Sequence, residues 1–187
     1  MNEQLPTGTI VAQLQLEVAE LKKVYREAVW ERSAILGLPR QNDDWPEAFV
    51  LMPFSVELKP IYEHHIKKTV SQLKLRIGRA DDFFGTGSIM KDVWSAIHAA
   101  RIVIADCTGR NPNVFYEIGL AHAIGRDTIL ISQSIDDVPF DLRHLRVILY
   151  KYTPPGMDAF EKALRTTITQ SYNIKPPQAR SATAGAP

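Results

Sequence analysis

The polar run at residues 106–117, DCTGRNPNVFYE, holds the side chains best suited to chemistry. Asn113 and Glu117 are four residues apart, so both project from one face once a helix has begun. A carboxylate in that position suits attack on the anomeric carbon of a sugar, or stabilisation of an oxocarbenium-like transition state. The structural alternative is that Glu117 favours a helix N-terminus, Asn113 caps that helix and Asp106 holds backbone amides.

A second candidate segment is the loop at residues 81–88, DDFFGTGS. Its glycines, with the exposed amides at the start of the next helix, are suited to cradling a phosphate. It lacks the Lys-Ser/Thr ending of a P-loop and does not match GxGxxG, so a surface turn capped by Ser88 is the alternative. Asp92, one turn further, either faces the same site as Glu117 or is a solvated charge. The binding candidates in this loop are Asp82, Gly85, Gly87 and Ser88.

Short apolar runs alternate with helical patterns from residue 48 onward, and they predict the elements that position these side chains. Continuous apolar runs are typical of parallel strands that helices cover on both faces. We therefore expect an α/β domain with a doubly wound, Rossmann-like parallel sheet of five strands in the order 2-1-3-4-5. The predicted strands are residues 48–52, 73–77, 101–107, 128–132 and 147–150, and the predicted helices are residues 61–73, 89–100, 114–125 and 158–172.

This strand order also predicts where a ligand binds. In such a sheet the crevice lies at the carboxyl ends of the first and third strands, where the winding reverses. The Met-Pro-Phe-Ser sequence at residues 52–55 follows the first strand, and residues 106–117 follow the third. We therefore expect Phe54 and Glu117 to lie at one crevice, with the loop at residues 81–88 nearby.

The N-terminal segment has a different pattern. Apolar residues recur there at alternating spacings of four and three, which is typical of a heptad seam, and Arg32 interrupts it. The pattern predicts a helix at residues 11–36 that either pairs with a second copy as a coiled coil or packs against its own domain. The seam residues are Leu14, Val18, Leu21, Tyr25, Ala28 and Ile35.

Composition divides the chain into three parts and excludes several classes. We expect a helix and linker at residues 1–46, the α/β domain at residues 47–173 and a disordered tail at residues 174–187.

The 22 basic and 21 acidic side chains leave a net charge of +1, which does not favour nucleic-acid binding. A single cysteine, Cys107, fits a reducing compartment. Lacking a secretory signal pattern and a long apolar span, the sequence predicts a soluble cytoplasmic protein. No metal-ligand spacing is present in the sequence, and we expect no cofactor.

Residues 48–150 resemble the nucleoside 2-deoxyribosyltransferase-like superfamily, which is related in fold to TIR-like NAD-cleaving domains. The likeness rests on the opening strand that ends in Met-Pro-Phe, on Asp92 in the helix before the third strand, and on the run DCTGRNPNVFYEIGLAHA from Asp106 onward. In that family a glutamate followed by Ile/Leu-Gly-x-Ala is the nucleophile, which falls on Glu117. The family's aspartate that helps to handle the base falls on Asp92.

The resemblance has further implications for binding. It implies that Phe54 stacks on the base, that Asn111 and Asn113 bind ribose hydroxyls, and that the protein acts as a homo-oligomer. Family transferases commonly carry an aspartate six residues before the glutamate, where this chain has Asn111. The sugar, and the choice between hydrolysis and transfer, therefore stay open.

From these observations we expect an N-glycosidic-bond hydrolase or transferase that acts on a nucleoside, nucleotide or NAD-like substrate through Glu117. The alternative is a non-catalytic nucleotide-binding sensor, oligomerised through its N-terminal helix. A third possibility is a scaffold in which Glu117 and Asp92 form salt bridges with Arg110 or Arg79. The substrate-binding candidates are Phe54, Asp82, Gly85, Gly87, Ser88, Asp106, Asn111 and Asn113.

Overall fold

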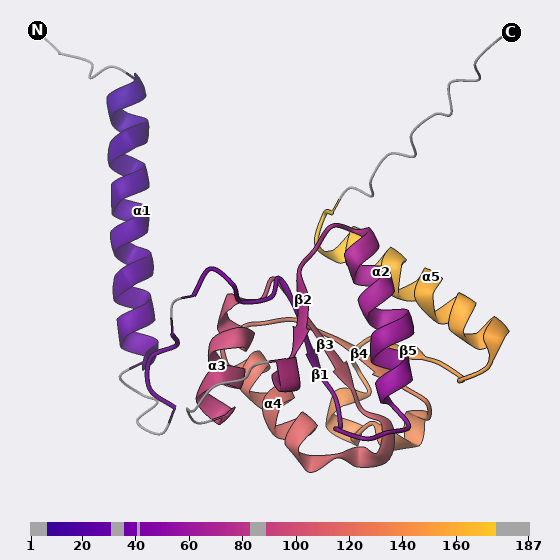
Figure 1. Ribbon diagram of the computed structural model, residues 1–187. Coiled ribbons are helices and arrows are strands. Elements are labelled where there is room, and N and C mark those ends of the chain that lie inside the picture. The colour runs from indigo at the N-terminus through magenta and orange to yellow at the C-terminus, as the bar shows by residue number, and fades with distance from the viewer. Residues whose placement is uncertain (1–6, 31–35, 41, 83–88, 175–187) are drawn as a thin grey trace, which may run out of the picture. The chain divides into compact units, whose positions relative to one another are not determined.

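A computed structural model describes residues 7–30, 36–40, 42–82 and 89–174. The chain forms two compact units, Met1–Pro39 and Arg40–Pro187. The second unit holds an all-parallel sheet of five strands in the order β2-β1-β3-β4-β5 (Figure 1), so the predicted α/β fold class and strand order are confirmed. The strands are β1 (Ala48–Leu51), β2 (Ile77–Arg79), β3 (Ile102–Asp106), β4 (Thr128–Ser132) and β5 (Val147–Leu149).

Helices cover both faces of this sheet (Figure 1). One face packs against a wide helical turn, η1 (Ile61–Ile66), its continuation α2 (Lys67–Gln72), and α5 (Pro154–Ser171). The other face packs against α3 (Ile89–Ala99) and α4 (Pro112–Ala123). Successive residues of each strand point to opposite faces, so a strand buried on both sides must be apolar throughout, as β1 is. Short helical turns complete the unit: η2 (Ala80–Asp82), η3 (Thr108–Arg110), η4 (Ile135–Asp137) and η5 (Phe140–Leu142).

The second strand lies later in the chain than predicted. The alternating pattern at residues 73–77 predicted a strand, whereas the residues that pair with β1 are those of β2. Lys74 has a φ of 61°, a left-handed conformation that turns the chain at the end of α2. Leu75 is buried in the core beside α2 and α5 and does not pair in the sheet. Arg79, which follows the predicted strand, is instead the last residue of β2.

Two helices begin earlier than their apolar periodicity predicted. Helix α4 begins at Pro112, because Asn111 accepts a hydrogen bond from the backbone N–H of Asn113 and caps the helix. Helix α5 begins at Pro154, where Thr153 is the capping residue. Proline is favoured at the first helical position, since its missing N–H is not needed there. The polar first turn of α4 is therefore already helical.

The first unit contains α1 (Thr7–Trp30). The predicted helix was residues 11–36, of which residues 31–35 lie outside the described part of the chain. Residues 40–46 were expected to be a linker but belong to the second unit, where Trp45 is buried beside α3. In the described ranges, no helix combines the length and apolar character needed to cross a membrane.

Candidate functional site

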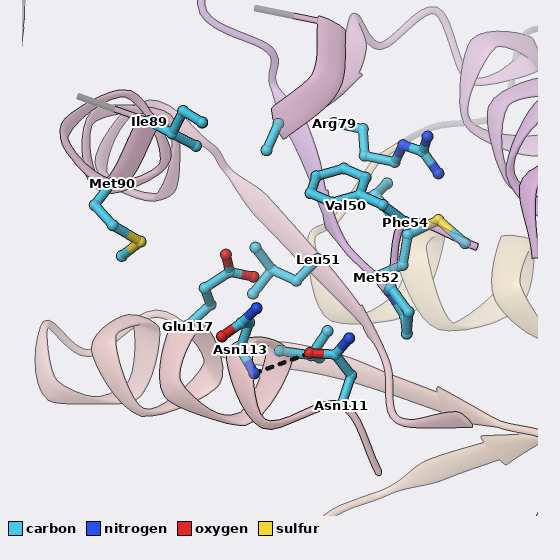
Figure 2. Close-up of a pocket in the computed structure, with 13 residues that line it drawn as sticks. Val50, Leu51, Met52, Phe54, Arg79, Ile89, Met90, Asn111, Asn113 and Glu117 are labelled. Carbon is cyan, nitrogen blue, oxygen red and sulfur yellow. Dashed lines mark hydrogen bonds between the residues drawn. The ribbon is translucent and has the colours of Figure 1, made fainter. Parts of the chain in front are cut away.

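A cleft of about 290 Å³ lies at the carboxyl end of β1, between the first turns of α3 and α4 (Figure 2). The sheet order predicts a ligand site at this edge, because the strand order reverses between β1 and β3. Most of the lining is apolar, and its polar groups come from β2, from α4 and from the residue that caps α4. The described lining residues are Val50, Leu51, Met52, Pro53, Phe54, Arg79, Ala80, Ile89, Met90, Asn111, Asn113, Val114 and Glu117.

Glu117 points its carboxyl group into this cleft from one turn inside α4 (Figure 2). Among the lining residues that the structure describes, it is the only carboxylic acid. Burial raises the pKa of Glu117 from 4.5 to about 7, because a low-dielectric surrounding disfavours the charged form. At neutral pH both protonation states are therefore populated, which suits a group that changes its charge during a reaction.

Two asparagines bring amide groups to the same cleft. The Asn111 side chain accepts a hydrogen bond of 2.9 Å from the backbone N–H of Asn113, so it caps α4 while lining the cleft. Asn113 and Glu117 both project into the cleft from one face of α4, as their spacing predicted (Figure 2). An amide offers both a donor and an acceptor, so this side of the cleft suits hydroxyl groups.

Phe54 forms an aromatic wall of the cleft. Its side chain is 64% exposed, and its ring centroid lies 5.3 Å from the guanidinium carbon of Arg79. The same guanidinium lies 4.8 Å from the ring centroid of Tyr62, so Arg79 is held between two rings. Arg79 is only 5% exposed, and its Nε donates to Asp81 at 2.5 Å. This fixed cation supports one face of Phe54 and leaves an aromatic surface for a flat ligand.

Asp82 stabilises the end of β2 and does not line the cleft. Its Oδ2 accepts hydrogen bonds of 2.9 Å from the Tyr62 hydroxyl and of 2.9 Å from the Arg79 backbone N–H. These contacts keep Tyr62 and Arg79 in place. Asp82 thus helps to position Arg79, on which the ring of Phe54 packs.

Asp92 lies in α3 and is also outside the cleft lining. Its Oδ1 accepts a hydrogen bond of 2.7 Å from Nη1 of Arg40, which forms an ion pair with it. The two residues predicted to be catalytic, Glu117 and Asp92, therefore occupy different surroundings. The salt bridges expected for a scaffold do not form among the described residues, because Arg79 pairs with Asp81 and Arg110 donates to the Asp136 carbonyl.

Asp106 at the end of β3 is fully buried and holds the turn that leads into α4. It accepts hydrogen bonds of 2.9 Å from the Thr108 backbone N–H and of 2.7 Å from the Tyr150 hydroxyl. Burial raises the pKa of Asp106 despite these two hydrogen bonds. Burial also raises the pKa of the adjacent Cys107 to about 12, so this thiol is not ionised at neutral pH.

Three of the predicted binding residues, Gly85, Gly87 and Ser88, lie outside the described residues. Conversely, Arg79 lines the cleft but was not predicted as a site residue, since nothing in the sequence after the predicted strand at residues 73–77 indicated burial. The signal that was available was its position before the acidic pair at residues 81–82. Within the described ranges, no group of three or more His, Cys, Asp or Glu side chains is placed to hold a metal ion.

Comparisons with known proteins do not assign a family or an activity to this chain. No model of a protein family matches the chain, and no curated protein matches it.

Proposed function

We propose that the cleft binds a nucleoside-like ligand and that Glu117 cleaves the N-glycosidic bond between its sugar and its base. One observation carries this proposal: the carboxyl group of Glu117, with a pKa of about 7, points into a largely apolar cleft at the switch point of the sheet. A carboxylate at the anomeric carbon is the group that such a reaction needs.

The neighbours of Glu117 support a ligand with a flat ring and a hydroxylated part. The exposed ring of Phe54 offers a stacking surface for a base, and the amides of Asn111 and Asn113 offer partners for sugar hydroxyls. The volume of about 290 Å³ is just below the range of about 300–1,000 Å³ for small-molecule sites. This favours a nucleoside or nucleoside monophosphate over a dinucleotide.

In the proposed reaction, an ionised oxygen of Glu117 bonds to the anomeric carbon as the bond from that carbon to the base nitrogen breaks. The base leaves with the electron pair and takes up a proton from solvent. Water then attacks the anomeric carbon, the ester bond to Glu117 breaks, and the water loses a proton to solvent. In a transferase, the nitrogen of a second base replaces this water. Asn113, on the same helix face, positions the sugar beside the carboxylate.

A second candidate function is a non-catalytic nucleotide sensor that uses the same cleft. The placement of Asp92 favours it, because that carboxylate pairs with Arg40 and does not line the cleft. Within the described lining, no second carboxylic acid is then available to protonate a departing base. In a sensor, Glu117 would contribute to ligand affinity and the bound ligand would stay intact.

The test is the chromatographic detection of free base after the protein is incubated with nucleosides, nucleoside monophosphates and NAD. Glu117→Gln keeps the shape of the side chain and removes its charge, so it should abolish release. Glu63→Gln, a change in η1 at a residue that does not line the cleft, is the matched control and should retain full release. If no ligand releases base while both wild type and Glu117→Gln bind it, the sensor replaces the enzyme.

A further inference from the structure

Helix α1 exposes a long apolar stripe to solvent. Every side chain described along it, at residues 11–25, is exposed. The five stripe residues are between 46% and 70% exposed, although apolar side chains at this spacing normally form the buried face of a helix. Helices gain most of their stability by covering such a face. These residues are Val11, Leu14, Val18, Leu21 and Tyr25.

The stripe follows a heptad repeat in which Val11, Val18 and Tyr25 occupy the first position, a, and Leu14 and Leu21 the fourth, d. β-Branched residues at a with leucine at d favour two parallel strands over trimers or tetramers. The two positions in the middle of α1, Val18 and Leu21, follow this rule. For helices that run parallel, the repeat therefore indicates that two of them share the seam.

The surface of α1 has two shallow grooves at the positions where side chains of a second helix would pack. One shallow groove is lined by Val11, Leu14, Gln15 and Val18, together with two flanking residues. In the heptad these four occupy positions a, d, e and the next a, which together form a hole that receives one side chain of a facing helix. A second groove, one heptad further, repeats the same set of positions. It is lined by Val18, Leu21, Lys22 and Tyr25.

Charged residues beside the seam select the orientation. Glu17 is at position g and Lys22, five residues later, is at position e. In a parallel, in-register pair, g of one helix faces e of the next heptad in the other, so two Glu17–Lys22 pairs of opposite charge form across the seam. In an antiparallel pair, g faces g and e faces e. No g position of α1 is basic and no e position is acidic, so that arrangement offers no such attraction.

We propose that α1 pairs with α1 of a second copy of this chain as a parallel, in-register, two-stranded coiled coil. The partner's leucines at positions 14 and 21 fill the two grooves, and the Glu17–Lys22 pairs flank them. This inference concerns the first unit alone and is independent of the chemistry proposed for the cleft.

Disulfide trapping in the full chain tests the orientation. Leu14→Cys and Leu21→Cys, made separately and exposed to mild oxidation, should each give a covalent dimer on non-reducing electrophoresis. Cys107, the native cysteine, is buried, so the wild type should give none. Leu16→Cys lies off the seam at position f and should give little product.

The pattern of products decides the proposal. In an antiparallel pair, the residue numbers of two facing positions always add up to the same value. Position 14 and position 21 therefore cannot both face their own copies. Cross-linking of only one variant, of neither, or of Leu16→Cys as strongly as the other two would overturn the parallel pairing. The measurement needs no substrate, so it is not affected if the glycosidase proposal fails.

Charge reversal is an independent measurement, made by sedimentation equilibrium on the full chain. Glu17→Lys and Lys22→Glu each convert two attractive pairs into two repulsive ones, and each should weaken association through α1 by roughly 5- to 30-fold. The double variant, Glu17→Lys with Lys22→Glu, recreates the pairs in reverse and should restore association. Association that is unchanged in the single variants, or not restored in the double variant, contradicts the proposed pairing.

Discussion

Glu117 and Asp92 hold their carboxyl groups in opposite electrostatic surroundings. Asp92 accepts a hydrogen bond from the Arg40 guanidinium at 2.7 Å, whereas Glu117 forms no ion pair or hydrogen bond with any residue in the described ranges. Burial alone accounts for the raised pKa of Glu117. Of these two carboxyl groups, only Glu117 lines the cleft.

We expect base release to rise with pH around neutrality. If Glu117 acts as the nucleophile it must be ionised, and its pKa in the free protein is about 7. The quantity kcat/KM should therefore increase from pH 6 to pH 8 with a midpoint near 7. Initial rates measured in buffers of constant ionic strength check this, and a rate that falls over the same range would show that the protonated acid is the active form.

Glu117→Gln should stabilise the protein at alkaline pH. Because the folded-state pKa of Glu117 is about 7, against an ordinary 4.5, the folded state holds this proton more tightly than the unfolded state does. The wild type therefore loses stability as the pH rises from 4.5 to 7, and the loss is complete above 7. With the partial exposure of the side chain taken into account, the variant should be more stable by roughly 1–2 kcal/mol at pH 8.

Urea unfolding at pH 4 and at pH 8 measures this difference. At pH 4 the carboxyl group is protonated in the folded state, so the two proteins should be nearly equally stable. A gain in stability at pH 4 as large as that at pH 8 would mean that the ionisation of Glu117 is not its cause.

Phe54→Ala should weaken ligand binding with little effect on the fold. The ring is 64% exposed and packs on the Arg79 guanidinium, so removing it should lower the free energy of unfolding by less than about 1 kcal/mol. Stacking of a base on an aromatic ring contributes about 1–3 kcal/mol, which predicts a roughly 5- to 150-fold rise in Kd for the nucleoside or nucleotide that binds. Titration calorimetry measures this rise.

The control for Phe54→Ala is Phe140→Ala. Phe140 is 85% exposed and does not line the cleft, so its removal should leave Kd unchanged. Equal effects of the two substitutions would argue against a stacking role for Phe54.

Asp92→Asn and Arg40→Gln should have matching effects. Each breaks the same ion pair, in which Asp92 is largely buried and Arg40 is about half exposed, so each should cost about 1 kcal/mol of stability. The double variant should cost less than the two changes added together, because both remove one interaction. Urea unfolding of the three variants gives the coupling energy.

Base release by the same variants tests the role implied by the resemblance. If Asp92 acts only through its pair with Arg40, the two single variants should change kcat to the same small extent. A large loss of kcat in Asp92→Asn alone would instead assign Asp92 a direct role in handling the base.

The local pattern of the sequence was enough to predict most of the elements and their order. Continuous apolar runs predicted β1, β3, β4 and β5 to within a residue or two, because a strand that is buried on both faces is apolar at nearly every residue. The spacing of Asn113 and Glu117 likewise predicted a shared helix face, since helical geometry is a local property. Order and spacing together were sufficient to locate the cleft at the switch point.

Contacts between distant parts of the chain decided the rest. Lys74 has a left-handed backbone conformation, which the alternating pattern around it did not indicate. The residues that pair with β1 therefore lie further along the chain than predicted. Asp92 accepts a hydrogen bond from Arg40, which lies 52 residues away in the sequence. The pKa of Glu117 depends on which side chains surround it once β1, α3 and α4 have packed. Periodicity is a local property and does not specify such partners. The formation of an ion pair and the burial of a carboxyl group depend on residues that become neighbours only when the chain folds.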